Sequence, residues 1–276
     1  MINKHLLIRR SLFIAYFVAV FLAFLIVLFP VDRLKGKLEA EVRQHTPFEL
    51  HVTRVSPFFF NQFILNDVVL SDRSGKVLFE SQSIRASISV FGLLSNLLSL
   101  DMKAKAYGGE LLVKAQQGPG RRYLQLDANG LDINSYSLLK ETGLRLSGKL
   151  GGNIEMNGDS GKGRLWLKGL TSRDLKFRGF SVPDLDFEQC WLEGDIKGDR
   201  LTIRKLDLEG KELKIQCRGD MVLRERGSLN ILVKLKPSER LAREQAQPLS
   251  LLKNKDAEGF YMFNLGGTLD APVPRL

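Results

Sequence analysis

Residues with the types and spacing needed for chemistry are few in this chain of 276 residues. The segment Gly143–Lys149 has the GxxxxGK spacing of a phosphate-binding loop, but Leu150 follows where a magnesium-binding Ser or Thr is required. A phosphate-binding loop also joins a strand to a helix, whereas alternating strand-like residues follow here. The sequence therefore predicts no nucleotide site at this segment.

Carboxylates occur in pairs at a spacing of two, as in Asp184/Asp186 and Asp207/Glu209. On a strand this spacing places both members of a pair on the same face, where two carboxylates could act as acid and base. Each pair lies in a segment of alternating polar and apolar residues, so we expect a solvent-facing position. The sequence contains neither a GxSxG nor an HExxH motif.

The cysteines and histidines also do not form a recognisable site. Cys190 and Cys217 lie in predicted strands of one region, and two interpretations are open: a disulfide in an oxidising compartment, or two buried free thiols. Neither cysteine has the spacing of a metal site, and the histidines are three: His5, His45 and His51. We expect surface or packing roles for His45 and His51. We therefore predict no catalytic residue, cofactor or metal, and a protein that is not an enzyme.

An uncharged apolar run of nineteen residues, 11–29, dominates the N-terminus. As a helix it would be about 28 Å long, close to the hydrocarbon thickness of a bilayer. It exceeds the apolar length of a signal peptide and ends without a small-x-small cleavage site, which favours a retained single-pass anchor. Lys and Arg flank both ends and do not decide the orientation, but the short basic tail before the run favours a cytoplasmic N-terminus.

The remainder of the chain predicts a mainly β fold. We expect a basic cytoplasmic tail over 1–10, a transmembrane helix over 11–29, a juxtamembrane helix over 30–46 and a β-rich domain over 47–276. From residue 48 apolar residues recur with period two between Gly-rich turns, which is typical of long antiparallel strands with one apolar face.

Helical interruptions and one irregularity complete this prediction. Asp132 is a candidate helix N-cap, and residues 237–258 are helix-prone but interrupted by Pro248, which we interpret as an outward excursion. A parity slip between Ile203 and Leu206 predicts a bulge near Arg204. The expected architecture is an elongated, curved antiparallel sheet, shaped like a groove, with a few short helices.

The net charge of +10 comes from 41 Lys and Arg against 31 Asp and Glu. These basic residues are spread along alternating segments and do not gather in one stripe, so we predict no nucleic-acid partner. Solvated strand faces beside an anionic membrane surface explain the charge equally well.

An aromatic cluster lies shortly after the juxtamembrane helix. It consists of Phe58, Phe59, Phe60 and Phe63. One interpretation is a hydrophobic entrance near the membrane that contacts lipid or a partner; the other is core packing beneath the preceding loop.

Several segments resemble known families. The segments 66–68 (NDV), Gly75, 84–86 (IRA), 93–94 (LL) and 108–111 (GGEL) follow one another as in the N-terminal module of AsmA-like proteins. With the central segment 146–158 (LSGKLGGNIEMNG) and the terminal segment 266–272 (GGTLDAP), a chain of this length resembles the protein N family of the type II secretion pathway (GspN).

This resemblance implies a bacterial inner-membrane protein whose C-terminal domain lies in the periplasm. It further implies a non-enzymatic component of the type II secretion system that acts in assembly or interaction, with other inner-membrane subunits as partners. The alternative is an AsmA-like protein that binds or transfers phospholipid or another lipid in an apolar β-groove, including a bitopic component of the kind used in lipopolysaccharide export. The resemblance carries over no functional residue.

Overall fold

The computed structural model describes residues 31–276 except 60, 90–91, 93–94, 138, 140–144, 174–175, 178–179, 182, 225–226, 253, 269–270 and 276. The predicted cytoplasmic tail and transmembrane helix lie outside these residues. Within the described part of the chain, no helix combines the length and the apolar character needed to cross a membrane.

Among the described elements of the first half, the helix α2 precedes the first strand and the 3-10 helix η1 follows β6. These elements are α2 (Val31–His45), β1 (Phe48–Phe59), β2 (Gln62–Asp72), β3 (Val77–Ile88), β4 (Leu98–Ala106), β5 (Gly109–Gly118), β6 (Arg121–Asp132) and η1 (Ile133–Ser135).

The second half contains the longest strands and two short helices. Its elements are β7 (Arg145–Asn157), β8 (Ser160–Arg173), β9 (Lys176–Phe177), β10 (Phe180–Ser181), β11 (Leu185–Lys197), β12 (Arg200–Gly210), β13 (Leu213–Val222), β14 (Leu229–Pro237), α5 (Glu239–Glu244), α6 (Ala246–Ser250), β15 (Tyr261–Gly267) and β16 (Pro272–Arg275).

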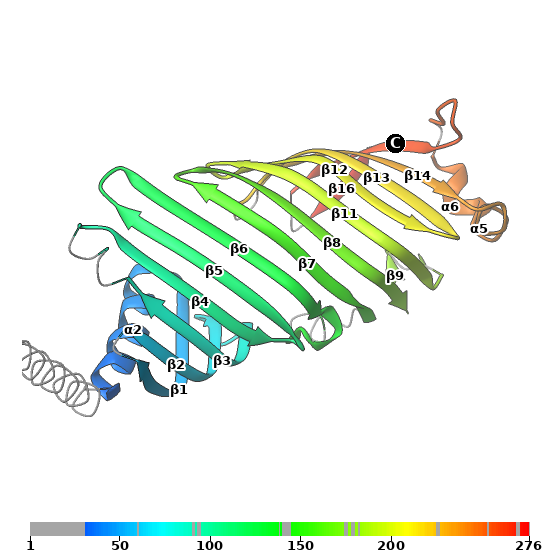
Figure 1. Cartoon of the computed structure of the whole chain (residues 1–276). Coiled ribbons are helices and arrows are strands. Elements are labelled where there is room, and N and C mark those ends of the chain that lie inside the picture. The colour runs from blue at the N-terminus through cyan, green and yellow to red at the C-terminus, as the bar shows by residue number, and fades with distance from the viewer. Residues whose placement is uncertain are drawn as a thin grey trace, which may run out of the picture.

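Fourteen of these strands form one antiparallel sheet in which spatial order follows chain order (Figure 1). β9 and β10 make a separate two-stranded hairpin between β8 and β11. Each strand of the large sheet pairs with the next strand of that sheet along the chain, so the sheet is a meander. The sheet is open, with β1 and β16 as its edges.

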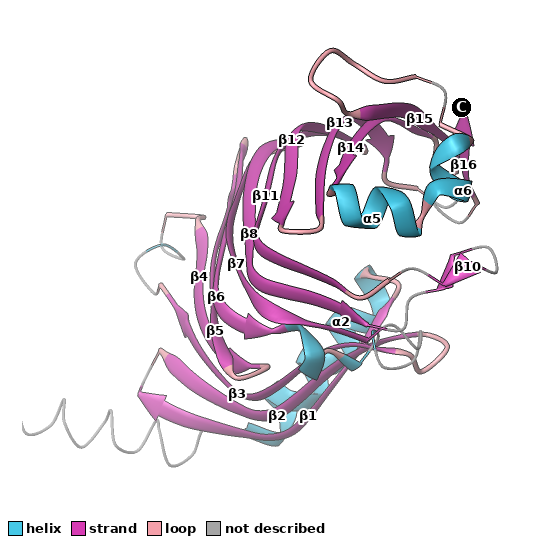
Figure 2. Ribbon diagram, turned by 90° about the vertical axis from the view of Figure 1, so that its right-hand side faces the viewer, coloured by secondary structure: helices cyan, strands magenta, loops and turns pink. Residues whose placement is uncertain are grey.

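The sheet is strongly curved, and its concave face is apolar. Figure 2 shows the strands following a wide arc with α5 inside it. The pairing register aligns apolar residues from strand to strand: Leu126 of β6 lies opposite Val113 on β5 and Ile154 on β7. Leu241 of α5 packs against Phe187 and neighbouring residues of this apolar set, which identifies the apolar face as the concave one.

The helix α2 covers the N-terminal end of the concave face. Leu38 packs against a buried cluster that includes Val52, Val68 and Ala86. The backbone N–H of Val52 donates to Glu39 Oε1 at 3.0 Å, so a helix carboxylate satisfies a donor on the edge strand β1. This contact fixes the helix against the sheet and blocks part of an exposed edge.

The opposite edge is protected in a different way. In the register of β16 with β15, Leu265 opposes Pro274 and Gly267 opposes Pro272. A proline has no N–H to give to the ladder, so both prolines occupy the outward-facing positions of β16. The outer edge of β16 therefore lacks these two donors, which disfavours pairing with a further strand.

The mainly β prediction is confirmed, as are several local ones. Asp132 accepts a hydrogen bond from the backbone N–H of Asn134 and caps η1, and the register shifts between Ile203 and Leu206 as expected for a bulge. The helix α2 coincides within one residue at each end with the helix expected over 30–46.

The prediction of an outward excursion over 237–258 is wrong. Ser238 Oγ accepts a hydrogen bond from the backbone N–H of Leu241 and starts α5, whose Leu241 is only 6 % exposed. The helix turns back onto the concave face because burying this leucine against Phe187 and Cys190 removes apolar surface from water.

Candidate apolar groove

The middle of the concave face carries apolar side chains that no buried cluster includes. We name this set the open strip; it crosses β5, β6 and β7 and consists of Leu111, Val113, Leu124, Leu126, Ile154 and Met156. All six are half-buried or exposed, and Leu124 is 39 % exposed. The three buried clusters of described residues, which include the contacts of α2 and α5 with the sheet, contain none of the six.

A depression of about 420 Å³ lies at one end of the open strip, near the β5–β6 turn. Its apolar lining comes from Leu98, Leu100, Ala115, Leu124 and Met156. Its polar lining comes from residues next to the turn, at the end of β5 and the start of β6: Gln116, Gln117, Arg122 and Tyr123. An apolar floor with polar groups confined to the border suits a ligand that is apolar along one part and polar at one end.

Glycine keeps the neighbouring part of the face hollow. Gly163 of β8 lies opposite Ile154 on one side and Gly194 of β11 on the other. If Gly163 carried a Cβ atom, the one side-chain atom within 4 Å of it would be Ile154 Cγ1, at 3.5 Å. At these glycines the concave surface therefore lies closer to the sheet backbone than it would beneath leucine side chains.

The structure divides the predicted aromatic cluster. Phe63 packs with the buried cluster beneath α2, as the core-packing interpretation expected. Phe58 and Phe59, at the end of β1, are 54 % and 53 % exposed. Phe60 lies outside the described residues. Phe63 therefore does not share one surface with the exposed rings of Phe58 and Phe59.

The two cysteines are free thiols on neighbouring parts of the concave face. Cys190 lies opposite Leu208 and Cys217 opposite Leu206, both on β12, so a whole strand separates them. Two strand spacings amount to about 10 Å, beyond the Cα separation of about 7 Å that a disulfide tolerates. The structure therefore supports the free-thiol interpretation.

Burial raises the pKa of both thiols from 9.0 to about 11. Only the thiolate is nucleophilic, so at pH 8 we expect both to react with Ellman's reagent on the order of 100-fold more slowly than an exposed thiol. Because the folded state holds these protons more tightly than the unfolded state, the free energy of unfolding should also decline as the pH rises from 9 towards 11.

Denaturant is the control for this measurement, since unfolding should release two thiols per chain that react at the ordinary rate. Rapid reaction of the native protein would contradict the burial of the thiols. If the unfolded chain gave no reaction with Ellman's reagent, the two cysteines would be joined in a disulfide.

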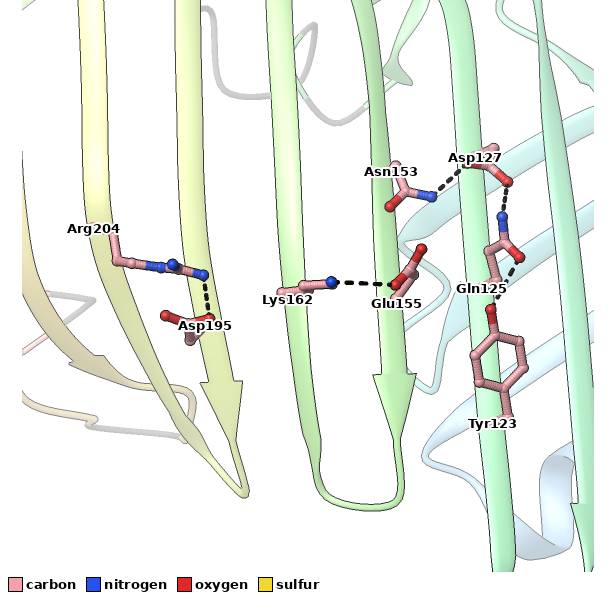
Figure 3. Close-up of polar contacts among 8 residues, drawn as sticks. All are labelled: Tyr123, Gln125, Asp127, Asn153, Glu155, Lys162, Asp195 and Arg204. Carbon is pink, nitrogen blue, oxygen red and sulfur yellow. Dashed lines mark hydrogen bonds and ion pairs between the residues drawn. The ribbon is translucent and has the colours of Figure 1, made fainter.

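The convex face is polar, and its side chains form hydrogen bonds and ion pairs with one another (Figure 3). The Tyr123 hydroxyl donates to Gln125 Oε1 at 3.0 Å, Gln125 Nε2 donates to Asp127 Oδ2 at 2.8 Å, and Asn153 Nδ2 donates to Asp127 Oδ1 at 2.6 Å. Ion pairs continue the pattern in Lys162–Glu155 and Arg204–Asp195. Exposed pairs of this kind contribute little stability each, and they give this face a water-compatible surface.

The predicted carboxylate pairs belong to this polar surface. Arg173 contacts both Asp184, at 3.6 Å, and Asp186, at 2.6 Å, while Lys205 Nζ lies 2.9 Å from Asp207 Oδ2. A cation therefore neutralises members of both pairs. Among the described residues, no group of three His, Cys, Asp or Glu side chains is arranged to hold a metal ion.

Two tryptophans form an apolar island on the convex face. The rings of Trp166 and Trp191 lie 6.1 Å apart between centroids with an interplanar angle of 40°, and Trp191 is 43 % exposed. Sequence reasoning missed this pair because the two residues are 25 positions apart and meet only through the register of β8 with β11.

Comparison with known proteins adds no relative: no protein-family model, curated protein or solved structure matches the chain.

Proposed function

We propose that this protein binds the acyl chains of a membrane lipid along the open strip. The observation that carries the proposal is the unburied apolar strip on the concave face of a one-layer sheet. A sheet with an apolar face normally buries it against a second layer. Among the described residues, α2 and α5 pack on this face at two places, and the six residues of the open strip between them belong to neither contact.

An acyl chain matches this surface better than a compact polar metabolite does. The strip offers apolar contact over three strands, and each Å² of apolar surface removed from water contributes about 25 cal/mol. Its members carry no charge, so a ligand charge would have to lie at the border. Flexible hydrocarbon chains satisfy both conditions.

The border at the β5–β6 turn suits an anionic headgroup. Arg121 and Arg122 begin β6 beside the depression, and Arg122 shares an ion pair with Asp159 at 3.4 Å. Arg121 is exposed. A guanidinium in this position can hold a phosphate oxygen while the acyl chains lie on the strip.

Photo-crosslinking from adjacent residues of β6 tests the proposal. We expect p-benzoylphenylalanine in place of Leu126 to form an adduct with the mass of a membrane phospholipid in the full chain. The same residue in place of Gln125 points to the convex face and should form none. Absence of a lipid adduct from position 126, or equal adducts from both positions, would reject the groove.

The second candidate is an interaction component of the type II secretion apparatus. The Trp166–Trp191 pair, in which Trp191 is exposed and Trp166 half-buried, favours it, because tryptophan is enriched among the residues that dominate protein–protein binding. The same photo-crosslinker in place of Trp191 would then capture an identified inner-membrane subunit of that apparatus. Lipid adducts confined to position 126 together with no such capture would favour the first candidate.

A further inference from the structure

The end of β1, next to the turn into β2, exposes two adjacent phenylalanines. Phe58 and Phe59 are each more than half exposed, while Phe63, four residues further along, packs beneath α2. Two large exposed rings next to each other are unusual at a hairpin end, where polar turn residues are the norm. Such a pair marks a surface that meets an apolar partner.

The position of α2 places this turn at one particular end of the molecule. The chain reverses after His45, and β1 then runs antiparallel to α2, with Glu39 fixed beside Val52. Both distances are measured from the contact between Glu39 and Val52. Residue 31, eight helical residues before Glu39, lies about 12 Å from this contact along the helix. Phe58, six strand residues after Val52, lies about 20 Å from it in the same direction. The start of α2 and the two rings therefore lie at the same end.

The apolar run 11–29 precedes this end of α2 in the sequence, with one residue between the run and the start of the helix. If the run crosses a bilayer, as its sequence predicts, the end of β1 faces the surface of that bilayer. Along the direction of α2, the end of β1 and the start of α2 differ in position by about 10 Å or less.

Basic side chains accompany the two rings. Lys35 and Lys37 lie in the first half of α2, and Arg54 lies on β1. Arg85 of β3 stacks on Phe58, with its guanidinium carbon 4.8 Å from the ring centroid. Aromatic rings surrounded by Lys and Arg are the combination that binds the interface of an anionic membrane.

We propose that Phe58 and Phe59 insert into the headgroup–acyl boundary of the bilayer from which the chain emerges, with Arg85, Arg54 and the α2 lysines contacting anionic headgroups. This second contact holds the sheet in a fixed orientation on the membrane, which a single flexible connection to an anchor would not do. The proposal does not rest on lipid binding by the open strip and stands if that strip binds nothing.

Depth-dependent quenching tests this proposal in the full chain. An NBD label is attached at neutral pH to Phe59→Cys, and in a second protein to Phe58→Cys, in bilayer discs of phosphatidylethanolamine and phosphatidylglycerol. The unsubstituted chain, in which Cys190 is buried and Cys217 half-buried, gives the blank. Leu251→Cys is the matched control, because Leu251 is 57 % exposed and lies beyond α6, in the other half of the chain.

Lipids that carry a spin label on the acyl chain should quench the labels at 58 and 59 by about half or more, as expected for probes about 5–10 Å deep. The label at 251 should lose less than about a tenth of its emission, because it lies outside the bilayer. Equal quenching at the turn and at 251 would overturn the proposal. Shielding of the label that is independent of spin-labelled lipid would indicate a protein partner and would overturn it as well.

Discussion

Replacing Leu124 by Asp should lower the phospholipid that co-purifies with the full chain by at least about tenfold, equivalent to about 1.4 kcal/mol. Leu124 lies on the open strip and on the wall of the depression. A carboxylate at this position either keeps its hydration shell, and the bound water then displaces the acyl chain, or it is desolvated at a cost of several kcal/mol. Phospholipid per protein, measured by quantitative mass spectrometry after detergent exchange, reports the change.

Leu112→Asp is a closely matched control for this substitution. Leu112 lies on the adjacent strand β5, is 40 % exposed against 39 % for Leu124, and lies on the convex face opposite Asp127. Lipid held around a membrane anchor would be the same in both variants. Equal loss of lipid in the two variants, or retention in both, would show that the open strip does not bind it.

The strands could be predicted from the sequence because their signal is local. Alternation of apolar and polar residues, with turns such as Lys197–Asp199, indicates strand and face together, and in a meander each strand pairs with its sequence neighbour. The bulge near Arg204 could be predicted for the same reason, since a parity slip is visible within one strand.

Coverage of the apolar face could not be predicted in this way, because it depends on packing between distant segments. Leu241 and Leu251 lie ten residues apart in one polar, helix-prone segment, yet one is 6 % exposed and the other 57 %. The polar, helix-prone composition of the segment does not distinguish the two leucines. The difference arises because the Ser238 cap aims the first turn of α5 back at Phe187 and Cys190.

The same limit applies to the candidate site. Phe58 and Phe63 belong to one aromatic run in the sequence, but the register of β1 with β2 sends Phe63 under α2 and leaves Phe58 beside Arg85. The sequence indicated that an apolar face exists. Among the described residues, the positions of α2 and α5 determine which part of that face remains open.

Replacing Leu241 by Ala should release α5 from the concave face while leaving the sheet folded. Truncating a buried leucine costs about 2–5 kcal/mol, and α5 has only six residues, too few to persist without its contact with the sheet. Amide hydrogen exchange of residues 239–245 should therefore accelerate by at least about 30-fold, which corresponds to about 2 kcal/mol. Exchange measured by mass spectrometry on the full chain checks this.

Leu251→Ala removes the same atoms from an exposed position and should leave exchange unchanged. Faster exchange throughout β11–β13 in Leu241→Ala would contradict a local release and would mean that the helix is needed to hold those strands. Unchanged exchange at 239–245 would mean that the Ser238 cap and its hydrogen bond to Glu212, at 2.6 Å, hold the helix without Leu241. A local release would instead show that the sheet tolerates exposure of its apolar face over β11–β13, as it does at the open strip.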